Sequence, residues 1–362
     1  MGILIALPIW VIVLWLFTAP NSNKNNAKLF MALCVVSLIF ILGFRSGSTG
    51  TRDTGIYLQA FESAKNSGSL DSFLDKIGFE YGKNALFSEI GFFSYMWVSS
   101  LVLPTAQWFL VLTSAIIVGL TAKFIWDNSE DYGLSWIIFI CLGSMTFSMN
   151  GMRQAMAMSI CLLAYTYAKN KKLVKFLLTI LVAILFHKSA LLFLIVYFVV
   201  NMKHGFKSTS LLVIGTAMFF SLADRLVFVY GDVVGEYYEI ESFDSGGIIP
   251  LAIYVIAIVL TLIVNASQNS DDKAPFHLLA LSVLGCALYC SRYFSTQIYE
   301  RISYYFLYFL MLLFPSVFKK ISSKERTIIV MLFLVCAVAL YMYRISKGSF
   351  ANFKLFFQGE LL

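Results

Sequence analysis

An apolar run from Phe176 to Val200 is interrupted in its middle by Phe186-His187-Lys188-Ser189. Imidazole and ammonium groups are costly in hydrocarbon, where a lysine at mid-bilayer costs roughly 2.5–3.5 kcal/mol on insertion scales. Ionisable residues at such positions usually line a hydrated cavity and serve a function. The interruption therefore predicts a site, and His187 is a candidate proton acceptor because an imidazole titrates near neutral pH.

Three arginines, Arg153, Arg292 and Arg301, lie near the ends of other apolar runs. A guanidinium group matches phosphate oxygens in bidentate fashion, so these residues are candidates for holding a phosphorylated ligand. Glu300 and Glu89 are carboxylates that could share the role of base with His187.

Each of these candidates also has a purely structural interpretation. Arg153 could reach the lipid headgroups from a helix end, and Arg292 and Arg301 could bind anionic lipid. His187 could bond to a carbonyl freed at a helix break. Glu89 could be a helix cap, since a carboxylate is favoured at a helix N-terminus, and Glu300-Arg301 could be an ion pair.

No carboxylate pair occurs at a spacing typical of metal ligands, and the other two histidines, His204 and His277, lie near segment ends. We therefore expect no metal site and no cofactor.

Composition sets the class of the protein that positions these residues. Hydrophobic residues make up 59% of the 362 residues and charged residues 13%, and apolar stretches long enough to cross about 30 Å of bilayer recur. The sequence predicts an all-α, polytopic transmembrane helical bundle of about 12–13 membrane segments in a single transmembrane domain, 1–362. The expected segments are 3–19, 27–44, 87–103, 105–126, 133–149, 152–168, 173–186, 189–200, 208–223, 248–264, 276–290, 302–318 and 326–343.

Two dense basic clusters, 169–175 and 319–326, predict which ends of the helices are cytoplasmic. Lys203 and Lys207 suggest that the end after Val200 is cytoplasmic too, which would make 173–200 a short hairpin broken at His187. Each arm would then have about 14 residues and a length of roughly 21 Å, less than a full crossing. A single tilted helix is the alternative.

Carried along the chain, this orientation places 150–154, an expected external loop at 224–247, and 292–301 on the same outer side as His187. The segment 45–86 is expected to be a loop with short amphipathic helices. Its side of the membrane stays open, because it is external only if 87–103 does not cross.

Five motifs together resemble the EpsG family of polysaccharide polymerases, relatives of the Wzy-type O-antigen polymerases. They are Arg-Asp-Thr-x-x-Tyr at 52–57, Glu-x-Gly-Phe at 89–92, Arg-Gln-Ala-Met-Ala at 153–157, Phe-His-Lys-Ser-Ala at 186–190 and Glu-Arg-Ile-Ser-Tyr-Tyr-Phe at 300–306. The likeness spans about residues 43–320. The first motif departs from the expected Gly-x-Asp, since this chain has Thr51-Arg52-Asp53.

The resemblance implies a glycosyltransferase of the bacterial inner membrane, with its active face periplasmic or external, that polymerises undecaprenyl-pyrophosphate-linked oligosaccharide repeats. An acceptor sugar hydroxyl would attack the donor anomeric carbon and the lipid pyrophosphate would leave. His187, Glu300 and Glu89 would then be catalytic.

The pyrophosphate would bind to Arg153, Arg292 and Arg301. The remaining substrate-binding candidates are Arg45, Arg52, Asp53, Tyr57 and Gln154. Expected partners are the lipid-linked glycan, membrane lipid and a chain-length regulator.

A transporter or flippase for a lipid-linked sugar is the alternative function, because it could use the same arginine-lined cavity without bond chemistry. The net charge of +7 fits lysine and arginine anchored to anionic lipid, so nucleic-acid binding is not indicated.

Overall fold

The computed structural model describes residues 2–47, 52–81, 89–202, 225, 248–267, 275–293, 298–347 and 350–358. In this part of the chain all regular structure is helical, which confirms the all-α bundle. The helices are α1 (Gly2–Thr18), α2 (Lys24–Gly43), α3 (Arg52–Lys65), α4 (Leu70–Tyr81), α6 (Ile90–Val102), α7 (Ala106–Asn128), α8 (Tyr132–Cys141), α9 (Ser144–Asn150), α10 (Met152–Lys169), α11 (Leu173–Phe186), η1 (Lys188–Phe193), α12 (Leu194–Asn201), α14 (Ile248–Ser267), α15 (Phe276–Ser291), α16 (Ile298–Leu307), α17 (Leu310–Phe318), α18 (Ser323–Lys347) and η4 (Phe356–Gln358). The expected segment 208–223 and the expected loop 224–247 lie outside the described residues, apart from Arg225.

Three described helices are long and apolar enough to cross a membrane: α2, α7 and the stretch Ser323–Ser346 of α18. Two further pairs qualify if each is counted as one span, α8 with α9 and α16 with α17, and they bend by 49° and 44°. The sequence predicts an unbroken segment at 133–149. The structure breaks it at Gly143, whose φ of 105° is a left-handed conformation that glycine adopts without strain.

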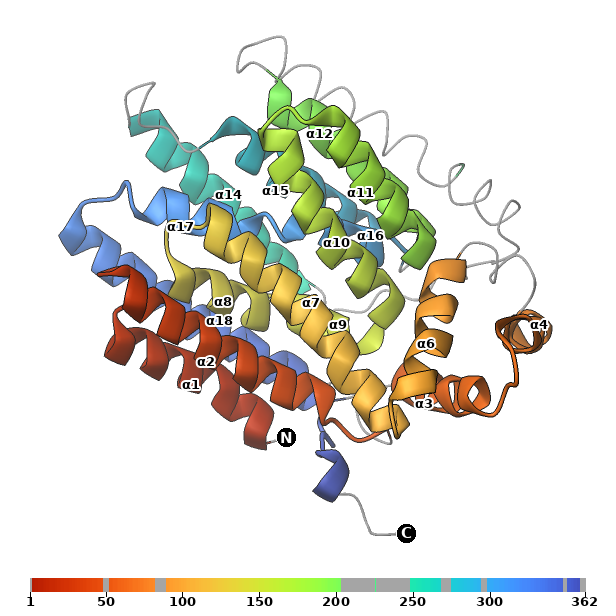
Figure 1. The fold of residues 1–362 in the computed structure, drawn as a ribbon. Helices are drawn as coiled ribbons and strands as arrows, with labels where there is room; N and C mark the ends of the chain where they lie inside the picture. Colours follow the sequence, from red (N-terminus) through yellow and green to blue (C-terminus); the bar gives the residue numbers. More distant parts are fainter. Residues whose placement is uncertain are drawn as a thin grey trace.

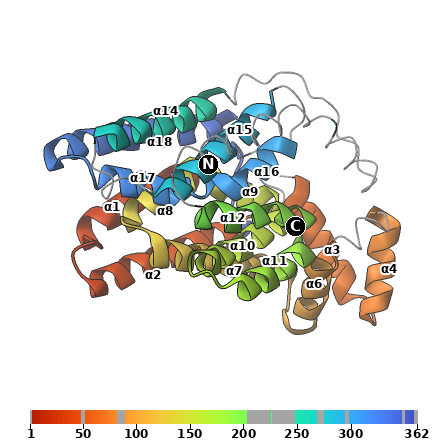
Figure 2. The same cartoon turned by 90° about the horizontal axis from the view of Figure 1, so that it is seen from above.

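The bundle has two distinct ends. The start of α1, the C-terminal residues 350–358 and α3 lie at one end (Figure 1). At the other end, Lys169 Nζ donates to Asn128 Oδ1 over 3.4 Å, and Lys319 forms an ion pair with Glu130. Both predicted cytoplasmic clusters therefore share one end. From above, α2, α7, α10 and α11 lie along one side and α14 and α18 along the other (Figure 2).

The chain returns on itself at His187, as the hairpin interpretation predicts. The rings of Phe176 in α11 and Tyr197 in α12 are 5.2 Å apart, although 21 residues of continuous helix would separate them by about 31 Å. Asn201 Nδ2 also donates to the carbonyl of Ala168 over 3.1 Å, at the end where α11 begins. His187 is therefore at the tip of a hairpin with arms too short to cross.

The segment between α2 and α7 enters and leaves the bundle at the same end. Gln107 Nε2 donates to the carbonyl oxygens of Gly43 and Arg45, over 2.5 and 3.3 Å, so the end of α2 meets the start of α7. Helix α6 has 13 residues, about 20 Å of helix, and does not cross. The described residues of segment 45–86 therefore lie at the same end as Gln107.

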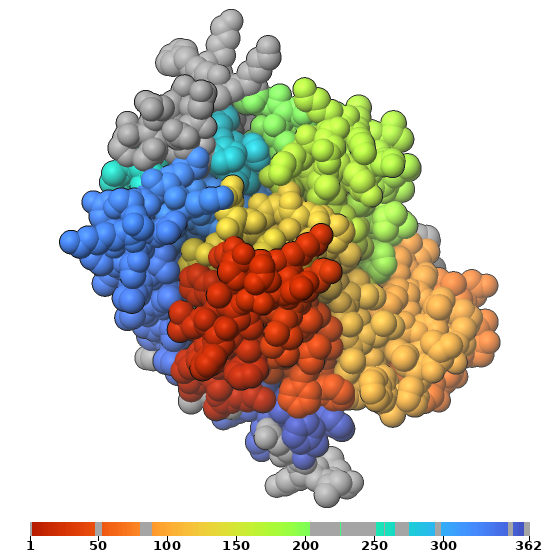
Figure 3. Space-filling view, turned by 60° about the vertical axis from the view of Figure 1, so that its left-hand side comes forward, coloured from red at the N-terminus to blue at the C-terminus, as the bar shows by residue number. Residues whose placement is uncertain are grey.

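Helices α3 and α4 pack on the protein through their aromatic residues. Tyr57, Phe61 and Phe73 are buried. Their rings meet those of Phe92, Phe109 and Phe93 respectively. Residues 52–102 form the orange part at one side of the body in Figure 3. This packing fixes the start of α6, and with it Glu89.

Gly91 allows α6 to approach α11 closely. A Cβ atom there would lie 2.7 Å from both Cβ and the carbonyl oxygen of Leu185. We expect Gly91→Ala to lower stability by about 1–3 kcal/mol, measured by thermal unfolding in detergent. Gly119→Ala is the matched control, because nothing lies within 4 Å of its Cβ position, and alanine is the better helix former. Equal melting temperatures for the two variants would contradict the close approach.

Candidate functional site

Glu89, Arg153 and His187 form one cluster, called here the His187 cluster, although they come from three elements. Glu89 is the N-cap of α6, Arg153 lies in the first turn of α10, and His187 is the break between α11 and η1. Glu89 Oε2 forms an ion pair with Arg153 Nη1, and Glu89 Oε1 lies 3.5 Å from His187 Nδ1. The helix break and the two helix starts thus meet at one point.

The carboxylate of Glu89 is the buried centre of this cluster. Only 6% of its side chain is exposed, against 34% for Arg153 and 19% for His187. Glu89 makes no capping bond with its side chain, so the cap interpretation accounts for its position but not for its contacts. A buried carboxylate requires paired charge, which Arg153 supplies.

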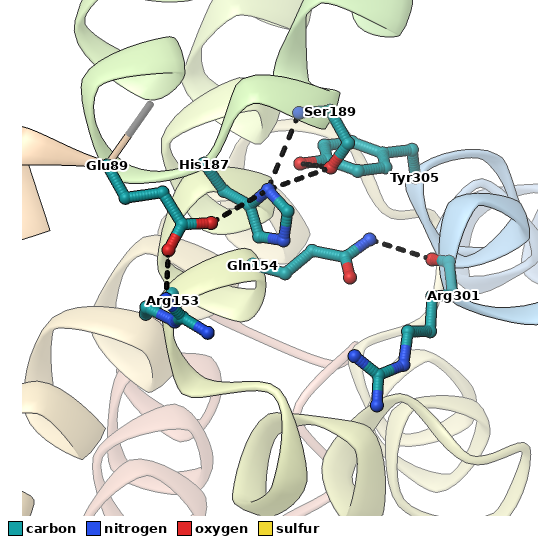
Figure 4. Close-up of polar contacts among 7 residues, drawn as sticks. All are labelled: Glu89, Arg153, Gln154, His187, Ser189, Arg301 and Tyr305. Atoms are coloured by element: carbon teal, nitrogen blue, oxygen red, sulfur yellow. Dashed lines mark hydrogen bonds and ion pairs between the residues drawn. The ribbon is translucent and has the colours of Figure 1, made fainter. Parts of the chain in front are cut away.

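The imidazole of His187 is held at one edge. Its Nδ1 faces Glu89, accepts a hydrogen bond from the backbone N–H of Ser189 over 3.5 Å, and lies 3.4 Å from Ser189 Oγ. Ser189 Oγ in turn lies 3.0 Å from the hydroxyl of Tyr305. The opposite edge, with Nε2, faces the side of the cluster where Gln154 lies (Figure 4). This geometry leaves Nε2 directed away from the groups that orient the ring.

Tyr57 extends the cluster to α3. The guanidinium carbon of Arg153 lies 5.9 Å from the centre of the Tyr57 ring. Burial raises the pKa of Tyr57, so the phenol is protonated at neutral pH and can donate a hydrogen bond. Asp53 lies in the first turn of the same helix. Arg52 begins α3, and its side chain lies outside the described part of the structure.

Gln154 connects α10 to α16. Its Nε2 donates to the carbonyl oxygen of Arg301 over 2.9 Å, and the residue is buried. The side chain of Arg301 extends away from that carbonyl, on the same side of the imidazole as Arg153 (Figure 4). The positive charges of Arg153, Lys188 and Arg301 all act on His187. Arg153 and Arg301 therefore both lie near enough to His187 for their charges to act on it.

Arg292 and Glu300 belong to a different group of side chains. Arg292 Nη1 forms an ion pair with Glu300, and Arg292 lies over the rings of Tyr289 and Tyr293 at 5.6 and 5.5 Å. The structure therefore pairs Glu300 with Arg292 and does not bring it into contact with His187. The three arginines expected to act as one clamp are divided between two groups.

Arg344 in α18 joins this second group and is absent from the sequence prediction. Its Nη2 donates to the hydroxyl of Tyr304 over 3.3 Å. The expected apolar segment ends at Tyr343, which makes Arg344 look like an ordinary cation at a helix end. An arginine continuing directly from an apolar run is the signal that could have identified it. We call Arg292, Glu300, Arg344 and their tyrosines Tyr289 and Tyr304 the Arg344 cluster.

Arg45 is buried and bound to the protein's own groups. It is 2% exposed, its Nη1 donates to the carbonyl of Leu42, and its Nη2 donates to the carbonyl of Met149 over 3.4 Å. Its Nε donates to Thr54 Oγ1 over 3.3 Å. Burial lowers the pKa of Arg45 to about 10, so it stays charged at neutral pH. The sequence suggests a substrate ligand, whereas these contacts join α2, α3 and the end of α9.

Arg45→Lys should destabilise the fold, because one ammonium cannot reach the three directions that the planar guanidinium serves. We expect a loss of about 1–3 kcal/mol, seen as a lower melting temperature in detergent. Arg326→Lys, at the opposite end of the bundle in a partly exposed position, is the control and should change stability by less than about 0.5 kcal/mol. Unchanged melting of the Arg45→Lys protein would argue for a role other than joining these elements.

Within the described ranges, no group of three or more histidine, cysteine, aspartate or glutamate side chains could hold a metal ion. His277 is bonded to Tyr165 at the end that carries the basic clusters, 2.9 Å from its hydroxyl. His204 lies outside the described residues.

Comparison with known proteins gives one match. The model of the EpsG family matches residues 28–357, which is nearly the whole chain. No curated protein and no solved structure matches. The match covers every residue of the His187 cluster and of the Arg344 cluster.

Proposed function

The chain belongs to the EpsG family of Wzy-type polymerase-like proteins, and we propose that it polymerises undecaprenyl-pyrophosphate-linked oligosaccharide repeats. Membership of this family supports a polysaccharide polymerase-like function in general. The proposal adds the lipid-linked donor, the direct glycosyl transfer and an active face on the periplasmic or external side of the bacterial inner membrane.

The observation that carries the proposal is the meeting of Glu89, Arg153 and His187 at the tip of a hairpin that does not cross the membrane. Such a tip is a place where charged groups can contact the headgroup of a lipid substrate while its hydrocarbon chain stays in the bilayer. Arg301 adds a second guanidinium on the same side as Arg153. Two guanidinium groups can each donate hydrogen bonds to the oxygens of one pyrophosphate.

In the proposed reaction, the hydroxyl oxygen of the acceptor sugar bonds to the anomeric carbon of the donor. The bond between that carbon and the pyrophosphate oxygen breaks, and the pyrophosphate leaves with the electron pair. Arg153 and Arg301 stabilise the charge that develops on it. The hydroxyl proton passes to Nε2 of His187.

In this scheme, Glu89 determines which ring nitrogen of His187 acts as the base. In the structure, Nδ1 accepts a hydrogen bond from the backbone N–H of Ser189, so the scheme requires the ring proton to move to Nδ1, where Glu89 Oε1 at 3.5 Å can accept it. Nε2 is then left as the proton acceptor. As Nε2 gains its proton, the carboxylate stabilises the resulting imidazolium, while Arg153 keeps Glu89 ionised. The carboxylate is therefore shared by the base and the pyrophosphate ligand.

Purified protein in detergent, supplied with a lipid-pyrophosphate repeat unit as the only substrate, tests the function. We expect a ladder of products that differ by whole repeats, and release of lipid pyrophosphate in equal number to the new bonds. If vesicles instead show translocation of the lipid without a ladder, the transporter alternative holds and the polymerase proposal is wrong.

A further inference from the structure

The Arg344 cluster lies on a different face of α16 from the residues that serve His187. Glu300 and Tyr304 are one turn apart on one face, where they contact Arg292 and Arg344 respectively. Arg301 lies on the neighbouring face, where its carbonyl oxygen accepts from Gln154 and its charge acts on His187 (Figure 4). Both clusters are at the same end of the bundle, because Arg344 is close to the end of α18 that leads to residues 350–358.

The Arg344 cluster contains more positive than negative charge. It has two guanidinium groups and one carboxylate, and that carboxylate pairs with Arg292. Nη1 of Arg344 is buried and has no hydrogen-bond partner among the residues that the structure describes. A buried N–H group without a hydrogen bond costs free energy. An anion with several acceptor oxygens could accept a hydrogen bond from it.

Gly143, at the bend between α8 and α9, lets the Arg344 guanidinium pack directly against the backbone. A Cβ atom at Gly143 would lie 2.3 Å from Arg344 Nη1 and 2.8 Å from the hydroxyl of Tyr304. Any residue other than glycine would therefore displace the guanidinium from the place where it meets Tyr304. The Tyr289 hydroxyl, 3.5 Å from Arg292 Nη1, is a further polar group at the same place.

The proposed reaction needs two anion sites. The donor loses its pyrophosphate at the reacting carbon, but the acceptor keeps its own pyrophosphate, one repeat unit away from the hydroxyl that attacks. We propose that the Arg344 cluster binds the pyrophosphate of the acceptor lipid, while Arg153 and Arg301 bind that of the donor. This inference rests on the proposed function, and it assigns the two clusters to the two substrates.

Native mass spectrometry of the full-length protein, titrated with undecaprenyl pyrophosphate, tests the assignment. We expect the wild type to bind two molecules, and Arg344→Gln to weaken one of the two by about 10- to 100-fold, as expected for a charged hydrogen-bonding group. Arg153→Gln should weaken the other, and the double variant should bind neither tightly. Two molecules bound equally well by wild type and Arg344→Gln would overturn the inference.

Two glycine variants show whether weaker binding by Arg344→Gln could result from misfolding alone. Gly143→Ala keeps the charge but displaces the guanidinium, so it should weaken the same molecule as Arg344→Gln. Gly119→Ala, which meets nothing within 4 Å, should bind two molecules as the wild type does. Normal binding by a folded Gly143→Ala protein would also overturn the inference.

The phosphate of an ordinary lipid headgroup has similar chemistry, so a competition arm uses phosphatidylglycerol. If an equal concentration of it displaces the molecule that depends on Arg344, the cluster is a general headgroup site and the inference is wrong. Single binding by a wild type that still makes the product ladder would refute the inference alone. Double binding without any ladder would refute the proposed function and the acceptor assignment with it.

Discussion

Arg153→Ala is expected to abolish polysaccharide longer than a single repeat unit, while expression and the single-repeat product stay normal. The guanidinium contacts Glu89 and the ring of Tyr57 at once, and in the proposed reaction it also holds the leaving pyrophosphate. Loss of such a group typically lowers the rate by about 10²–10³. Arg153→Lys should recover little, because an ammonium is a point charge without the planar fork. Gel analysis of the polymer and the in vitro ladder both measure this.

A second substitution separates the electrostatic role of Arg153 from its catalytic role. Without Arg153, Glu89 becomes a buried carboxylate that has lost its arginine, which costs about 3–5 kcal/mol in comparable pairs. Arg153→Ala combined with Glu89→Gln should therefore melt at a higher temperature than Arg153→Ala alone and still make no polymer. Polymer made by the double variant would mean that Arg153 only neutralises Glu89. Lys123→Ala, which removes an exposed ion pair with Asp127, is the control and should make normal polymer.

His187→Ala should have the second large effect, a fall in the rate of chain extension of about 10²–10⁴. The imidazole is the only candidate base at the hairpin tip that is in contact with Glu89 among the described residues. The rate of the wild type should depend on pH through one group that the variant lacks. Binding of the lipid pyrophosphate should be nearly unchanged, since Arg153 and Arg301 remain. Single-turnover assays across pH, beside binding measurements, test the two parts separately.

His277→Ala is the matched control, because it also removes a histidine that is partly buried and hydrogen-bonded. Its partner Tyr165 lies at the end that carries the basic clusters, so chain length and rate should be those of the wild type. Wild-type chain lengths in His187→Ala would remove the imidazole from the mechanism. A variant that binds substrate poorly but keeps its pH dependence would instead place His187 among the ligands.

The hairpin explains why the cluster depends on packing far from it. His187 is held at its depth by the two arms, which Phe176 and Tyr197 join near their other ends. Glu89 is held by α6, which reaches α11 only because Gly91 has no side chain. The distance of 3.5 Å between Glu89 and His187 is therefore the result of a helix contact as well as of their own charges.

The sequence by itself determined the helical architecture. A bilayer demands long apolar helices, so hydropathy alone locates the segments, and each expected segment within the described residues is helical. The break at His187 was also predictable, because a histidine and a lysine cannot be placed in hydrocarbon without a reason. The basic clusters correctly predicted which helix ends lie together, since Lys169 and Lys319 are at one end.

Only the tertiary structure decided which charges are partners. Glu89 and Arg153 are 64 residues apart, and nothing in local spacing distinguishes their pairing from a pairing of His187 with Glu300. Arg45 looked like a ligand and is bound to backbone carbonyls, whereas Arg344 looked like a helix end and has its Nη1 buried beside Gly143. Hydropathy is a property of each residue in its own segment, but an ion pair depends on how two helices rotate and approach, and that is set by packing across the whole bundle.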